Sequence, residues 1–190
     1  MKGLFRAVFL ATSFCLVSAV ANAQIRIHAL SGTVTSINPK IQMTEINPDD
    51  GSSPHFEWIK KSDGAIDFDK SVSSDAVSAD KFAIKDTHVI VYYFGEGEKR
   101  TVVALHDLGT GPLLKSSGTV VKFNKHDHLL TITNGTGGEE TYRTDAKTVG
   151  DTENGVATNN KFDFAKGIHV RVVAAQTGDS QTALLIVPMI

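Results

Sequence analysis

The sequence predicts an all-β protein made of two tandem five-stranded small barrels. Three observations lead to this fold class. The same short motifs occur twice in the same order, and the strand-like segments are short and rich in Val, Ile, Thr and Tyr. In addition, no segment sustains the 3.6-residue apolar period of a helix.

The internal repeat consists of collinear matches. Residues 31–34 and 117–120 both read SGTV, an offset of 86 residues (117 − 31). The later matches, in chain order, are 41–44 (IQMT) with 130–133 (LTIT), 81–82 with 161–162 (both KF), 88–91 (HVIV) with 169–172 (HVRV), and 97–98 (GE) with 178–179 (GD). The interval from the second motif to the third is 37 positions in unit one and 28 in unit two, which indicates nine extra residues (37 − 28) in unit one.

Each unit contains five strand-like segments separated by residues that favour turns. The segments are 32–38, 41–46, 56–60, 87–94 and 101–108 in unit one, and 118–124, 129–133, 140–144, 168–175 and 182–188 in unit two. The connection between the third and fourth segments is long enough for a short helix, and residues 72–77 are the best candidate.

This layout is typical of an OB-like barrel, and an SH3-like barrel is the alternative. The predicted organisation is a signal peptide (1–23), a first barrel (24–108), a linker (109–115) and a second barrel (116–190). Because the linker is short, we expect the two barrels to pack against each other.

The amino-terminal residues have the three parts of a signal peptide. Lys2 and Arg6 are followed by an uncharged, mostly apolar run (7–20) and by the small residues Ala21-Asn22-Ala23, so cleavage is expected after Ala23. The run is shorter than the roughly 20 residues of a membrane span, and we expect no stable membrane insertion after cleavage. The predicted location is a bacterial periplasm or the extracellular space.

Composition narrows the function classes. Cys15, the one cysteine, lies in the predicted signal peptide, so the mature chain would have no disulfide, thiol nucleophile or cysteine metal ligand. Loss of Lys2 and Arg6 would change the formal charge from −2 to −4. A mildly acidic chain does not favour binding to phosphate backbones, so we expect no nucleic-acid partner.

Several of the repeated motifs resemble a family of uncharacterised bacterial exported domains. The resemblance lies in Gly-Thr-Val at the start of a strand, in residues 167–172 (GIHVRV) and in the closing residues 182–186 (TALLI). Members of that family are repeated OB-like β-barrels, and the resemblance covers nearly the whole mature chain. It implies a fold and a compartment, and no site residues. Unit one departs from the pattern at Asp86, where the family has glycine before the fourth strand.

No motif for a catalytic residue or cofactor is present, so an enzyme is not expected and we assign no catalytic residue and no cofactor. His126 and His128 are weak candidates for metal ligands, since residues two apart on a strand share a face. They fall where a turn is expected, and no third ligand is apparent. His88 and His169 begin the fourth strand of each unit and are expected to face away from the core.

A stripe of large apolar residues distinguishes unit one. Ile90, Tyr92 and Phe94 lie on the non-core face of its fourth strand, where unit two has Arg171, Val173 and Ala175. Such a stripe is expected to be buried. The cover could be the extra residues near Ile66 and Phe68, unit two, or a second molecule.

The sequence therefore favours an exported, non-catalytic module that binds or scaffolds an unknown protein or small-molecule partner. The binding candidates are weak: Ile90, Tyr92, Phe94, Trp58 and Tyr93. One alternative is a small-ligand or oligosaccharide binder that uses the barrel face around Trp58, Tyr92 and Tyr93. A hydrolase is the third alternative.

Overall fold

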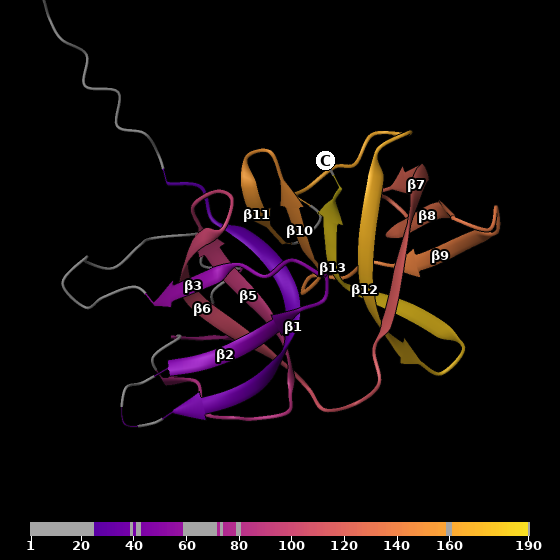
Figure 1. Cartoon of the computed structure of the whole chain (residues 1–190). Coiled ribbons are helices and arrows are strands. Elements are labelled where there is room, and N and C mark those ends of the chain that lie inside the picture. Colours follow the sequence, from indigo (N-terminus) through magenta and orange to yellow (C-terminus); the bar gives the residue numbers. More distant parts are fainter. Residues whose placement is uncertain are drawn as a thin grey trace, which may run out of the picture.

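The computed structural model describes residues 25–38, 40, 43–58, 72, 74–78, 81–158 and 161–189. Within these ranges the chain forms a six-stranded sheet and a seven-stranded sheet, one from each unit. Figure 1 shows the two units side by side, the first coloured indigo to magenta and the second orange to yellow. The predicted signal peptide lies outside the described residues.

In unit one, strands follow the order β2-β1-β5-β6-β3, and β4 also pairs with β6. The β3–β6 pair is parallel, whereas the other pairs are antiparallel. The bounds are β1 (His28–Asn38), β2 (Met43–Pro48), β3 (His55–Trp58), β4 (Ala76–Ser78), β5 (His88–Phe94) and β6 (Lys99–Gly109).

In unit two the corresponding order is β9-β8-β7-β12-β13, and a parallel β13–β9 contact closes the ring. A β10–β11 hairpin attaches to β13 through β10, in parallel. The bounds are β7 (Leu114–Asn124), β8 (Leu129–Asn134), β9 (Glu139–Arg143), β10 (Val149–Thr152), β11 (Gly155–Ala157), β12 (His169–Thr177) and β13 (Ser180–Pro188).

The pairing confirms two tandem five-stranded OB-like barrels. In each unit the first strand lies between the second and the fourth, and the fifth pairs in parallel with the third. Unit two is the more closed, because β8 pairs with β9 along five residues, from Leu129–Arg143 to Thr133–Glu139. The described parts of β2 and β3 do not pair. Pro54 stands in unit one where unit two has Glu140, and proline has no N–H to donate to a ladder.

The β-bulges show that the repeat is structural. The first strand carries one extra residue between Val34 and Ser36 in unit one, and between Val120 and Lys122 in unit two. The fifth strand also carries one extra residue, which lies opposite residues 92–93 in unit one and opposite residues 173–174 in unit two. Because bulges are fixed features of a fold, their coincidence confirms that the two barrels are copies of one unit.

The strand pairing corrects the sequence alignment of the second strand. Ile46 pairs with Val34, and Ile132 with Val120, so Ile46 corresponds to Ile132 at offset 86. The match of residues 41–44 with 130–133 was therefore three residues out of register, since short alternating segments match in several registers. Equivalent residues of the two units are 81 positions apart in the fourth and fifth strands. Unit one therefore carries a net five extra residues (86 − 81), whereas the sequence alignment predicted nine.

The connection between the third and fourth strands contains short strands in both units. In unit two it contains the β10–β11 hairpin. In unit one, Ala76 and Val77 belong to β4, so the expected helix at residues 72–77 is wrong in its second half. Ile66 and Phe68 lie outside the described residues. No helix in the described parts is long and apolar enough to cross a bilayer.

Apolar side chains form one core in each barrel and a third cluster between the units. Val89 and Val91 point into the unit-one barrel, whereas Ile90 and Tyr92, 1% and 0% exposed, belong to the cluster between units. The prediction that the stripe is buried is thus confirmed for these two, and unit two contributes to the cover. The unit-two members of that cluster are Val149, Val173 and Leu185.

The two units pack through equivalent positions. Tyr92 pairs with Ala104 in unit one, and Val173 pairs with Leu185 in unit two. Each unit-two residue lies 81 positions after its equivalent in unit one. All four side chains belong to the cluster between the units. Burying a large apolar side chain stabilises a fold by roughly 1.5–3 kcal/mol, so this shared face contributes substantially to holding the units together.

A polar clasp adds to the apolar contact. The chain entering β1 lies beside the β10–β11 hairpin, where the N–H of Val156 donates to the carbonyl of Ile27 at 2.8 Å. The Asp151 carboxylate, 4% exposed, accepts the backbone N–H of Ala29 at 3.1 Å and lies 3.0 Å from Nδ1 of His28. Gly155 permits this approach, because its φ is +97° and a Cβ there would lie 2.8 Å from the Ile27 carbonyl oxygen.

Candidate functional site

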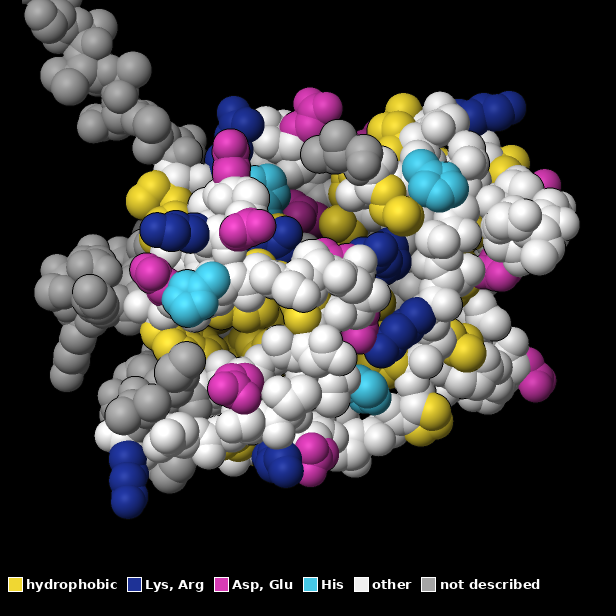
Figure 2. Space-filling model, viewed as in Figure 1, with side chains coloured by type: hydrophobic (Ala, Val, Ile, Leu, Met, Phe, Trp, Pro, Cys, Tyr) yellow, Lys and Arg dark blue, Asp and Glu magenta, His cyan; other side chains and the backbone are white. Residues whose placement is uncertain are grey.

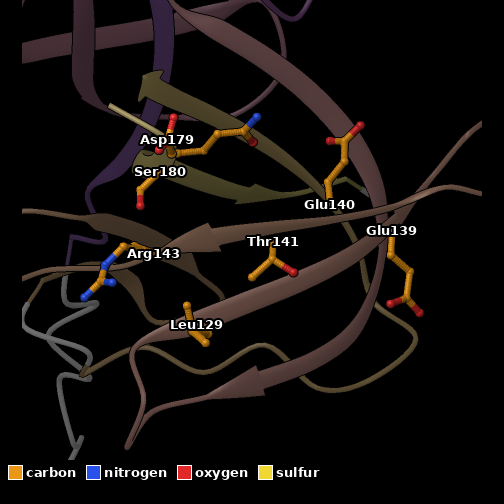
Figure 3. A pocket seen from close by; sticks show the side chains of 8 residues that line it. Leu129, Glu139, Glu140, Thr141, Arg143, Asp179 and Ser180 are labelled. Atoms are coloured by element: carbon orange, nitrogen blue, oxygen red, sulfur yellow. The ribbon is translucent and has the colours of Figure 1, made fainter. Parts of the chain in front are cut away.

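An open polar groove lies on the unit-two barrel (Figure 3). Its volume is about 430 Å³. It is formed by β8, β9 and the turn between β12 and β13, which are the second strand, the third strand and the fourth-to-fifth connection of the barrel. The lining residues are Leu129, Glu139, Glu140, Thr141, Arg143, Asp179, Ser180 and Gln181.

Glu140 accepts three hydrogen bonds in one wall of the groove. Its carboxylate accepts hydrogen bonds from Ser116 Oγ at 2.5 Å, Tyr142 Oη at 2.5 Å and Asn134 Nδ2 at 2.7 Å. The bond from Ser116, with those from Tyr142 and Asn134, lowers the pKa of Glu140. Burial and the bond to Glu140 raise the pKa of Tyr142 to about 12, so its hydroxyl remains a donor. This carboxylate is therefore committed to holding β8, β9 and β7 together.

The other charged groups of the groove have no partner among the residues that the structure describes. The side chains of Glu139, Arg143 and Asp179 make no ion pair or hydrogen bond to any described residue. Figure 3 shows Glu139 and Glu140 on opposite sides of β9, and Asp179 and Ser180 across the hollow from Leu129 and Thr141. Two carboxylates and one guanidinium are thus free to contact a ligand.

The His126-Asp127-His128 triplet forms the turn between β7 and β8, as predicted. Asn124 organises the turn, because its Oδ1 accepts the backbone N–H groups of His126 at 3.1 Å and Asp127 at 3.2 Å. The His126 side chain is 97% exposed, and His128 has a φ of +56°. No group of three or more His, Cys, Asp or Glu placed to hold a metal occurs among the described residues.

The repeated histidines each pair with a repeated threonine. Thr33 Oγ1 lies 3.1 Å from Nδ1 of His88, and Thr119 Oγ1 lies 3.2 Å from Nδ1 of His169. His88 is half-buried and His169 is exposed, on the face opposite the barrel core. The pairs join the first strand to the fourth in both units, which gives these histidines a structural role.

Two residues of the stripe, which was considered as a binding surface, are buried at the contact between the units. Ile90 and Tyr92 are buried between the units, 1% and 0% exposed, so the stripe is not an open face, although Tyr92 lines a small cleft between the units. Phe94 is half-buried and packs against the same cluster. These side chains are buried because unit two packs against the non-core face of β5. The sequence of unit one alone does not show this contact.

Trp58 and Tyr93 lie on the other face of the sheet from Tyr92, packed against the unit-one core. The three aromatic residues therefore do not form the single ligand face that was considered. Tyr93 stacks with Arg100, whose Cζ is 4.8 Å from the ring centroid, and borders a cavity of about 50 Å³. That cavity has room for a few water molecules, not for a sugar ring. The Trp58 indole Nε1 is enclosed, and no described residue forms a hydrogen bond with it.

Sequence reasoning missed the groove. Its charged residues are scattered over β9 and the β12–β13 turn, and they match no motif. One available signal was the Asn134-Gly135 turn, which places β8 beside β9.

No protein-family model and no curated protein matches the sequence. Among solved structures the chain is similar to the structure titled "Crystal structure of Ag(I)CusF", at 13% identity and a TM-score of 0.32. The alignment covers 40% of this chain and 96% of that one. The fold assignment rests on the strand pairing described above.

Proposed function

We propose that the chain is an exported, non-catalytic binding module whose unit-two groove holds a polar ligand. The observation that carries this proposal is the set of uncommitted charges, Glu139, Arg143 and Asp179, around one groove. OB-fold barrels use the face of strands two and three with the adjoining loops for binding, and the groove occupies that face.

Charge narrows the ligand class. The groove presents two free carboxylates and one guanidinium, and the chain carries a formal charge of −2. Figure 2 shows acidic and basic side chains interspersed on the visible face of the molecule. Nucleic acid requires a gathered positive surface, so a neutral or cationic polar ligand, such as an exposed basic peptide segment, fits better.

Export is the part of the proposal that rests on the sequence. The positive start, the apolar run and the Ala21-Asn22-Ala23 ending support secretion through a cleaved signal peptide. The absence of cysteine after residue 15 means that each barrel folds without disulfides.

The groove is tested by titrating the ¹⁵N-labelled chain with short basic peptides, acidic peptides and neutral oligosaccharides. We expect basic peptides to shift the backbone amide signals of β9 and the β12–β13 turn. The double variant Asp179→Ala/Glu139→Ala should abolish the shifts. Its matched control is Glu98→Ala/Ser53→Ala, the equivalent positions in unit one, which should leave them unchanged. Shifts confined to unit one, or none with any probe, would contradict the proposal.

A further inference from the structure

A second cleft lies between the two units. Its volume is about 210 Å³. Unit one contributes Val72, Asp75, Tyr92 and His106, and unit two contributes Lys147 and Val149. The cleft is smaller than the roughly 300–1,000 Å³ of sites for drug-sized ligands, so it suits a smaller molecule. Interfaces between domains are common places for ligand sites.

The cleft combines an apolar wall with one charge of each sign. Val72, Tyr92 and Val149 belong to the apolar cluster between the units. At the other side, Lys147 Nζ lies 3.2 Å from Asp75 Oδ2, and these side chains are 76% and 48% exposed. An exposed ion pair of this kind contributes little to stability, so a ligand can separate the two charges at small cost.

The other titratable groups at the cleft are neutral donors or acceptors. Burial raises the pKa of Tyr92, so its phenol stays protonated, and burial lowers the pKa of His106, which favours the neutral imidazole. The charged groups near this pair are Asp75, Lys147 and Asp107. Of these three, Asp75 and Lys147 line the cleft, so the formal charges of its walls balance.

We infer that this cleft binds a small zwitterion, a free α-amino acid with an aliphatic side chain. The ligand carboxylate would accept hydrogen bonds from Lys147, and its ammonium group would donate to Asp75. The aliphatic side chain would lie on Val72 and Val149. Each protein charge would thereby exchange a weak exposed partner for a ligand partner.

The probe is L-leucine, titrated into the full purified chain by isothermal calorimetry. The comparison ligands are 4-methylpentanoate, which lacks the ammonium group, and 3-methylbutylamine, which lacks the carboxylate. We expect leucine to bind and both analogues to bind about tenfold more weakly or worse, because each loses one charge-assisted hydrogen bond. An analogue that binds as tightly as leucine overturns the inference, as does the absence of leucine binding at about 10 mM.

Variants locate the site. Asp75→Asn and Lys147→Gln should each weaken leucine binding about tenfold or more. Lys166→Gln, a change at an exposed lysine of unit two, is the matched control and should leave the affinity unchanged. The groove variant Asp179→Ala/Glu139→Ala should also leave it unchanged, which separates this site from the groove. Circular dichroism of each variant checks the fold, and unaltered leucine affinity in folded Lys147→Gln overturns the assignment.

Discussion

The side chains of His28 and Asp151 meet across the interface between the two units, with Nδ1 and Oδ1 3.0 Å apart. Asp151 is almost fully enclosed, and its second oxygen accepts the backbone N–H of Ala29. One carboxylate on the β10–β11 hairpin thus fixes both the side chain of one residue and the backbone of the next at the start of β1.

Replacing this carboxylate should destabilise the whole chain. Asp151→Ala leaves the enclosed Ala29 N–H without an acceptor, so we expect a loss of about 1–3 kcal/mol in the free energy of unfolding. Urea denaturation followed by circular dichroism measures it. The control is Asp163→Ala, because Asp163 is 67% exposed and forms a surface ion pair with Lys125. Equal losses in the two variants would show that the clasp does not stabilise the fold.

The same pair predicts a pH dependence. The hydrogen bond to Asp151 raises the pKa of His28 above its usual value of 6.5, so the folded state favours protonated imidazole. The resulting stabilisation is complete below about pH 6.5 and is lost as pH rises through the raised pKa. The advantage of the unaltered chain over His28→Gln should therefore shrink between pH 6 and pH 8. The exposed His169→Gln provides the comparison, and an advantage that grows with pH would contradict the argument.

The interface cluster can be tested with two isoleucines. Ile90→Ala should cost about 2–5 kcal/mol, because a buried side chain is removed from the cluster between the units. Ile84→Ala, at a side chain that is 51% exposed, should change stability by no more than about 0.5 kcal/mol. Thermal unfolding of both variants, side by side, separates the outcomes. If Ile90→Ala is as stable as Ile84→Ala, the docking of the units contributes little.

A backbone difference between the units gives a reciprocal test. Asp86 has a φ of +59°, and Gly167 holds the equivalent place with a φ of +92°. A side chain in this left-handed region costs roughly 1–2 kcal/mol, so Gly167→Asp should lower stability by about that amount. Asp86→Gly should relieve strain and raise the melting temperature. Gly111→Asp, where φ is not in that region, serves as the reference. A destabilised Asp86→Gly would mean that its side chain has a role of its own.

Processing is tested at the protein's own terminus. Amino-terminal sequencing of material from the producing cell should begin at Gln24, since the small residues before it fit the recognition site of a signal peptidase. An intact Met1, or an acylated Cys15, would exclude a cleaved signal peptide of this type.

The fold followed from the sequence where alternation and repetition were strong. Val89 and Val91, matched by Val170 and Val172, identified the core face of the fourth strand. Tyr92 and its partner Ala104 lie on the opposite face of the sheet. The docking of the units was expected in general but not in detail. The clasp could not be predicted, because an aspartate in the connection between two predicted strands carries no sign that it will receive the N–H of Ala29.

The candidate site was harder to predict than the fold. Whether a carboxylate is available depends on its neighbours in space, and Glu139 and Glu140 are adjacent in sequence yet differ completely in this respect. For the same reason Tyr92, an attractive binding residue in the sequence, is fully buried.

The clasp also governs the order in which the chain can mature. Ala29 and Asp151 are 122 residues apart, so the first strand obtains its last partner only when the β10–β11 hairpin has been synthesised. Until then Ile90 and Tyr92 remain uncovered by unit two, and such surface is what chaperones and proteases recognise. A product truncated between the barrels should therefore be cleared by the cell, and the two units should persist or disappear together.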